Sequence, residues 1–113
     1  MKKALLILTL MAVTFFMACS KKAHMAKFIP TTYTIDVAPL IQAKCTPCHI
    51  PSRAGRKADF ETYESAKKYG TDMLVRIQLN PTDRGFMPFK HEKLTAEEIV
   101  IFKKWVDQGM LEK

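Results

Sequence analysis

The chain of 113 residues contains few of the residues from which most metal and catalytic sites are built. It has three cysteines and three histidines, and only one pair of cysteines lies close together. A structural zinc site uses four such ligands, usually including a second cysteine pair, so the sequence does not favour one. It contains no paired carboxylates in a pocket-like motif and no activated nucleophile. A conventional catalytic constellation is therefore not expected.

The sequence also lacks the patterns of extended or repetitive architectures. It has no internal repeat and no low-complexity tract, and residues 33–37 alternate briefly without a second strand to pair with. Lysine and arginine total 18 against 11 acidic residues, which gives a net charge of +7. No nucleic-acid-binding motif accompanies this charge, so nucleic acid is not the expected partner. The length and patterning predict one small all-α domain.

One long apolar run is present, and it lies at the N-terminus. Lys2 and Lys3 precede residues 4–18, which are almost wholly apolar. A positive start followed by a run too short for a stable membrane span is typical of a secretory signal peptide. We therefore predict that residues 1–18 are a signal peptide and that the protein is exported. Removing them takes away two lysines and no acidic residue, which lowers the net charge to +5.

Cys19 directly follows the small residue Ala18 at the end of this run, an arrangement that resembles a bacterial lipobox. The resemblance implies lipidation of the Cys19 sulfur and anchoring at the periplasmic side of a bacterial membrane. Residues 19–32 lack sustained periodicity and are predicted to be a tether in which His24 is solvated. Lys21 and Lys22 would favour anionic lipid. The alternative is an ordinary signal peptide with an incidental cysteine.

The most informative stretch is Cys45-Thr46-Pro47-Cys48-His49. Two cysteines separated by two residues, followed at once by histidine, have the spacing of covalent c-type haem attachment. Both sulfurs can add to the vinyl groups of one porphyrin, and the imidazole can bind the iron from the proximal side. We therefore predict one covalent haem c held by Cys45, Cys48 and His49. A thioredoxin-type redox pair would need a preceding strand and a βαβ frame, which are not evident. Zinc and a plain disulfide are further alternatives.

A second stretch, residues 84–89, offers a distal ligand for the same iron. Met87 lies between Gly85 and Pro88, in a predicted loop before the last helix. Glycine permits close approach of the backbone to a ligand, and proline stiffens the chain after the methionine. We predict Met87 as the distal axial ligand, with His91 as the alternative and core packing as the other role open to a methionine.

The remaining patterns predict short helices around these two stretches. The first helix is expected to begin with a cap at Asp36 and to end at Lys44. The second is expected over residues 61–69, with Gly70 as its stop, and the third over residues 72–79, after a cap at Thr71. The fourth lies within residues 93–111. The last begins with a Thr95–Glu98 capping box and ends near Gly109. It carries one apolar stripe, with two lysines on the other side (Ile99, Phe102, Trp105 and Val106; Lys103 and Lys104). Residues 50–57 are expected to be a basic loop that is either solvated or close to the haem edge.

In this order the segments resemble a monohaem class I c-type cytochrome of the small, membrane-tethered bacterial kind, over residues 33–111. The resemblance implies an all-α domain at 33–113 whose first and last helices cross beside the haem. It also implies a one-electron carrier, not an enzyme, and we expect redox partners with acidic docking surfaces. The alternatives are a haem sensor or peroxidase-like enzyme with a labile sixth ligand, and a haem-free thiol–disulfide oxidoreductase.

Overall fold

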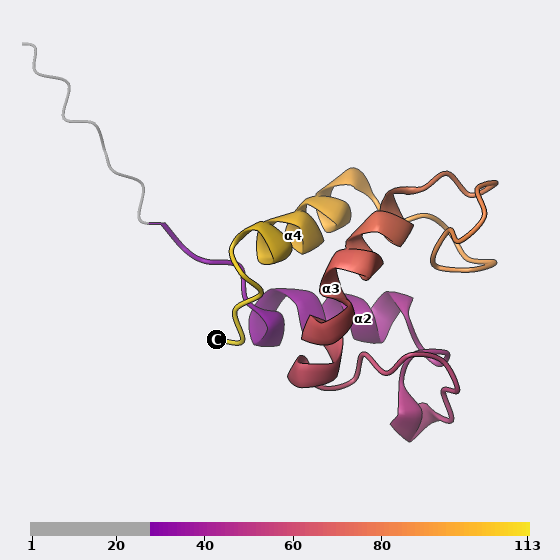
Figure 1. Ribbon diagram of the computed structural model, residues 1–113, viewed down its shortest axis with the longest axis horizontal. Coiled ribbons are helices and arrows are strands. Elements are labelled where there is room, and N and C mark those ends of the chain that lie inside the picture. Colours follow the sequence, from indigo (N-terminus) through magenta and orange to yellow (C-terminus); the bar gives the residue numbers. More distant parts are fainter. Residues whose placement is uncertain (1–27) are drawn as a thin grey trace, which may run out of the picture.

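The computed structural model describes residues 28–113. Among these residues there is no strand, which confirms the all-α prediction, and no helix is long and apolar enough to cross a membrane. A π-helical turn, η1 Tyr33–Val37, leads directly into α2 Ala38–Lys44. A 3-10 turn, η2 Pro51–Arg53, follows the Cys-x-x-Cys-His stretch. Two longer helices, α3 Tyr63–Gln78 and α4 Ala96–Asp107, complete the fold (Figure 1). The predicted signal peptide, Cys19, His24 and the tether up to residue 27 lie outside the described residues.

The first helical segment begins earlier than the sequence predicted. Thr32, not Asp36, is the N-cap of η1, and its hydroxyl accepts a hydrogen bond from the Ile35 amide at 3.4 Å. The Asp36 carboxylate instead lies in the first turn and accepts a hydrogen bond from the Thr32 amide at 2.7 Å. The prediction of Asp36 as the cap was therefore wrong, because the helical segment begins four residues earlier, after Thr32. The Thr32 hydroxyl and the Asp36 carboxylate each accept a hydrogen bond from a backbone amide in this first turn.

The predicted break at Gly70 was also wrong, since α3 runs without interruption from Tyr63 to Gln78. A Cβ added at Gly70 would lie 3.1 Å from Cζ3 of Trp105 and 2.5 Å from the sulfur of Met110. The glycine therefore allows α3 to pass close to α4 and the segment after it, and does not end the helix. Helix geometry tolerates an interior glycine when a close crossing requires one.

The closing helix agrees with its sequence signals at both ends. The Thr95 hydroxyl accepts from the Glu98 amide at 3.2 Å, and the Glu98 carboxylate accepts from the Thr95 amide at 2.9 Å, which confirms the capping box. Gly109 follows the helix with a φ of +88°, a left-handed conformation that favours glycine. Lys103 and Lys104 are exposed, as predicted for the polar side of the helix.

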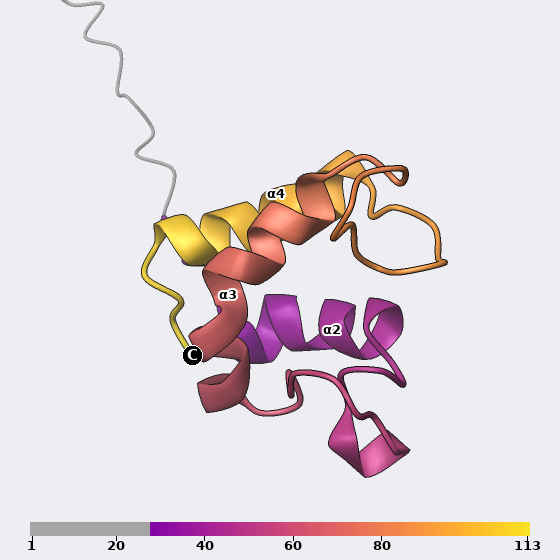
Figure 2. The same cartoon turned by 45° about the vertical axis from the view of Figure 1, so that its right-hand side comes forward.

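The two ends of the domain meet in one core. The Tyr33 amide donates to the Leu111 carbonyl at 2.8 Å, and the C-terminus lies beside the start of the first helical segment (Figure 1). α4 packs on α3 and on η1. The expected contact between the first and last helices is therefore made by η1. α2 lies below α3 and α4 in Figure 2. The largest fully buried side chains come from η1, α2, the residue before η2 and α4: Val37, Ile41, Ile50, Phe102 and Trp105.

Candidate functional site

One cavity of about 470 Å³ brings together the predicted site residues. Its volume lies within the range of about 300–1,000 Å³ that is usual for cofactor and ligand sites. Cys45, Cys48, His49 and Met87 all line it, and so does His91, the alternative distal residue. Apolar side chains from α3, α4 and the connecting loops form much of its remaining wall: Phe60, Met73, Ile77, Pro88, Leu94 and Phe102.

The two thiols lie where α2 ends. Cys45 is the C-cap of α2, and its amide donates to the Ile41 carbonyl at 2.9 Å, so the helix leads directly into the motif as predicted. Cys45 is partly buried and Cys48 is exposed, and both are free thiols. Burial, with a smaller contribution from nearby Cys48, raises the pKa of the Cys45 thiol to about 11. A thioredoxin-type nucleophile instead requires a lowered pKa, so this environment does not suit a redox pair.

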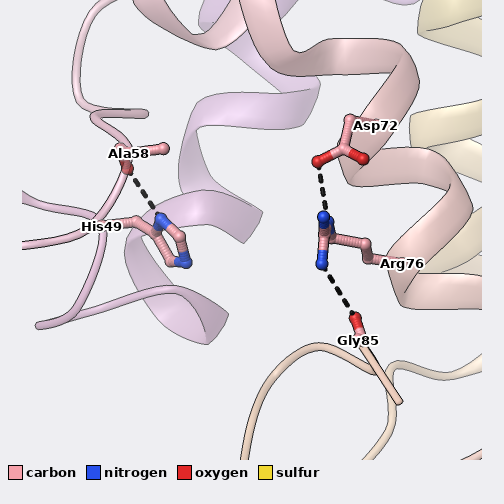
Figure 3. Close-up of polar contacts among 5 residues, drawn as sticks. All are labelled: His49, Ala58, Asp72, Arg76 and Gly85. Atoms are coloured by element: carbon pink, nitrogen blue, oxygen red, sulfur yellow. Dashed lines mark hydrogen bonds and ion pairs between the residues drawn. The ribbon is translucent and has the colours of Figure 1, made fainter. Parts of the chain in front are cut away.

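The imidazole of His49 is held by a loop that follows it in the sequence. Its Nδ1 lies 2.7 Å from the carbonyl oxygen of Ala58, and its ring stacks on Phe60 at 4.1 Å between centroids with an interplanar angle of 3°. Because a carbonyl only accepts hydrogen bonds, the proton belongs on Nδ1 and the lone pair on Nε2. Figure 3 shows Nδ1 facing the Ala58 carbonyl and the other ring nitrogen on the far side of the ring, toward the side on which Arg76 lies. His49 therefore presents a nitrogen that is free to bind a metal.

The loop that supplies the Ala58 carbonyl folds back onto the motif itself. The Lys57 amide donates to the Cys48 carbonyl, and the Phe60 amide donates to the His49 carbonyl, both at 3.0 Å. Gly55 lies against the motif backbone so closely that an added Cβ would be 2.4 Å from the Pro47 oxygen. The basic residues of this loop, Arg53, Arg56 and Lys57, are exposed, and Lys57 also lines the cavity, while Ile50 at the start of the predicted loop is buried and residues 51–53 form the turn η2.

The same loop is joined to the start of α3 through Glu61. The Ser52 amide donates to the Glu61 carboxylate at 2.9 Å, and the Ser52 hydroxyl also donates to it. These two hydrogen bonds lower the pKa of the Glu61 carboxyl group, because they favour its charged form. They tie η2 to the segment that enters α3.

Met87 and His91 both border the cavity from the loop between α3 and α4. Met87 is partly buried, and its amide donates to the Arg76 carbonyl at 3.3 Å. His91 is exposed, and its amide donates to the Pro88 carbonyl at 3.2 Å. Gly85 has a φ of +94°, which only glycine adopts without strain, and it lets the chain turn toward α3 just before the methionine.

Three polar side chains at the cavity were not identified from the sequence. Arg76 Nε lies 2.7 Å from Asp72 Oδ2, and both residues line the cavity from α3. Their spacing of four residues on a helix was a signal that could have revealed the pair. The third is Thr46, whose hydroxyl oxygen is buried without a hydrogen-bond partner. No sequence pattern marks such an atom.

Within residues 28–113, no group of three or more histidine, cysteine, aspartate or glutamate side chains is arranged to hold a metal ion. No protein-family model matches the chain, and it matches no curated protein and no solved structure.

Proposed function

We propose that this protein is a one-electron carrier that holds a single c-type haem covalently through Cys45 and Cys48. The observation that carries the proposal is the shared cavity, in which both thiols, the His49 imidazole and the Met87 thioether border one largely apolar space. The sequence spacing supports the same assignment independently, because Cys-x-x-Cys-His is the attachment pattern for c-type haem.

The residues present fit such a group. The cavity is lined by apolar side chains suited to a porphyrin face, and His49 Nε2 is available because Nδ1 is occupied by Ala58. Thr46 also lines this cavity, and its buried hydroxyl has an unused capacity for a hydrogen bond, which a bound polar group or water would satisfy. When bound, the haem would supply an iron that alternates between the ferrous and ferric states.

The roles of the chain follow from this arrangement. The Ala58 carbonyl keeps the His49 ring in one tautomer and orientation, as partners of metal-bound histidines generally do. Met87 would offer a soft, neutral sulfur that favours ferrous iron and raises the potential relative to a second imidazole. With His49 and Met87 both holding the iron, no site for a substrate would be left on it, so the group would supply one-electron transfer alone.

The export and partner assignments belong to the same proposal. We propose that residues 1–18 are removed, that Cys19 carries lipid, and that the domain at 33–113 works on the periplasmic side of a bacterial membrane. The exposed basic residues Arg53, Arg56 and Lys57 lie on the loop that covers the haem motif. They would attract redox partners with acidic docking surfaces.

The ligand assignment predicts different results for two single substitutions. We expect the oxidised protein to show a methionine–iron charge-transfer band that is lost in Met87→Ala and kept in His91→Ala, because only the thioether gives rise to it. Absorption spectra of the purified, haem-loaded variants measure this. The reverse pattern would assign the distal position to His91.

The alternative functions give other outcomes. Rapid binding of carbon monoxide by the reduced wild type at neutral pH would indicate an open or labile sixth position, and hence a sensor or a peroxidase-like enzyme. Mass spectrometry of protein produced in a haem-attaching host tests the premise itself. A chain without added haem mass, with thiols at Cys45 and Cys48, would contradict the proposal and leave the oxidoreductase alternative.

The basic loop predicts how charge affects the rate of electron exchange. We expect the double variant Arg56→Glu, Lys57→Glu to be oxidised several-fold more slowly by ferricyanide at low ionic strength, and faster by a cationic cobalt(III) complex. Stopped-flow rates should converge with wild type at high salt, because the Debye length falls to about 3 Å at 1 M. Lys104→Glu, an exposed lysine on α4 that does not line the cavity, is the matched control and should change either rate less.

A further inference from the structure

Arg76 contacts the loop that carries Met87 twice, once through its backbone and once through its side chain. Its backbone carbonyl accepts a hydrogen bond from the Met87 amide at 3.3 Å, and its guanidinium Nη1 lies 3.5 Å from the Gly85 carbonyl oxygen. These contacts bracket Phe86, whose side chain is buried. Arg76 therefore contacts the loop on both sides of Phe86, and one of the two residues it contacts, Met87, lines the cavity.

The guanidinium is itself held in place from within α3. Arg76 Nε lies 2.7 Å from Asp72 Oδ2, one helical turn earlier, and Figure 3 shows the group aligned between that carboxylate and Gly85. The planar guanidinium presents donors in two directions, so one side chain serves both partners. A Cβ at Gly85 would lie 3.3 Å from Nη1, so the guanidinium rests directly against the loop backbone.

We propose that Arg76 is a positioning residue that holds the loop over residues 85–87 on α3 and thereby fixes where the Met87 sulfur enters the cavity. The inference rests on the proposed function, in which that sulfur is the distal ligand of the haem iron. Arg76 faces the same cavity as His49 but from the opposite side (Figure 3). It acts through the loop and has no need to contact the iron.

The chemistry of the side chain makes the assignment specific. A lysine at this position would keep the charge, but its single ammonium group lacks the planar fork that reaches Asp72 and Gly85 together. We therefore expect Arg76→Lys to lie between wild type and Arg76→Ala in every measurement below. The backbone hydrogen bond to Met87 is available in all three proteins, so the differences report on the guanidinium alone.

The test uses the full-length, haem-loaded protein and three readouts. In Arg76→Ala we expect a weaker methionine–iron charge-transfer band and faster amide hydrogen exchange at Met87. We also expect a roughly three- to tenfold larger fraction of molecules that bind carbon monoxide. This factor corresponds to losing one charge-assisted hydrogen bond that is long and partly exposed. The exchange rate reports on the loop independently of the spectrum of the haem.

Lys103→Ala is the matched control, because it removes an ion pair of the same spacing, Lys103 with Asp107 at 2.5 Å, on an exposed face of α4. It should leave all three readouts at wild-type values. If Arg76→Ala does so too, while the wild type carries haem and shows the band, the positioning role is refuted and the proposed function stands. If Arg76→Ala does not fold, Arg76→Lys decides by the same criterion. A wild type without haem overturns both proposals together, whereas one that carries haem but lacks the band overturns the Met87 assignment and the role of Arg76 that rests on it.

Discussion

Gly55→Ala is expected to destabilise the domain by about 3 kcal/mol or more, at or above the upper end of the usual range for overpacking, because the neighbouring atoms cannot move aside. The added Cβ would lie 2.4 Å from the Pro47 oxygen and 2.8 Å from both the Cys48 oxygen and the Ile50 nitrogen. All three are backbone atoms, so no side-chain rotation relieves the contact. The loop or the motif beneath it has to move.

The displacement would reach the proposed haem site directly. The residues after Gly55 hold the motif through hydrogen bonds from the Lys57 amide to the Cys48 carbonyl and from His49 Nδ1 to the Ala58 carbonyl. A shifted loop weakens both, so we also expect a smaller yield of haem-loaded protein. A domain of this size has a total stability of roughly 5–10 kcal/mol, so the loss would be a large fraction of it.

Chemical denaturation of the purified variants, followed by circular dichroism, measures this effect. Gly109→Ala is the matched control, since Gly109 has a φ of +88° but nothing within 4 Å of an added Cβ. It should lose only about 1–2 kcal/mol, the cost of a left-handed conformation for alanine. A Gly55→Ala protein as stable as Gly109→Ala would show that the loop does not lie on the motif as described.

Features governed by neighbours in the sequence were predicted well. Thr95 and Glu98 form a capping box because the two groups are three residues apart, and no other part of the fold is needed to bring them together. The left-handed turn at Gly109 and the helix that leads into Cys45 are local in the same sense. The pattern of residues 93–111 therefore sufficed for the closing helix.

Features that depend on distant segments were missed. Gly70 has the local appearance of a helix stop, but it lies inside α3 because Trp105, far along the chain, needs the space. At the candidate site, the residue types at Cys45, Cys48 and His49 could be identified from their spacing. The partner of the imidazole could not, because it is the backbone carbonyl of Ala58 and any residue supplies one. The contact of Arg76 with the Gly85 carbonyl is hidden for the same reason.

Trp105→Ala is expected to cost about 3–5 kcal/mol, as large-to-small substitutions of buried aromatic residues do. The side chain is fully buried between α3 and η1, with its ring 6.1 Å from that of Tyr33 between centroids. Its indole Nε1 also donates to the Leu111 carbonyl at 2.9 Å. Removing it empties the space beside Gly70 and leaves the C-terminal segment with one fewer attachment to the core.

Two further substitutions separate the packing from the hydrogen bond. Trp105→Phe keeps an aromatic ring but removes the donor, so we expect a smaller loss of about 1–3 kcal/mol. Val100→Ala changes a half-exposed position on the same helix and should stay within about 0.5 kcal/mol of wild type. Denaturation midpoints should follow this order. A Trp105→Ala protein no less stable than Val100→Ala would contradict the packing of α4. Because Leu111 also accepts from the Tyr33 amide, the same series tests whether the two ends of the domain are joined through this tryptophan.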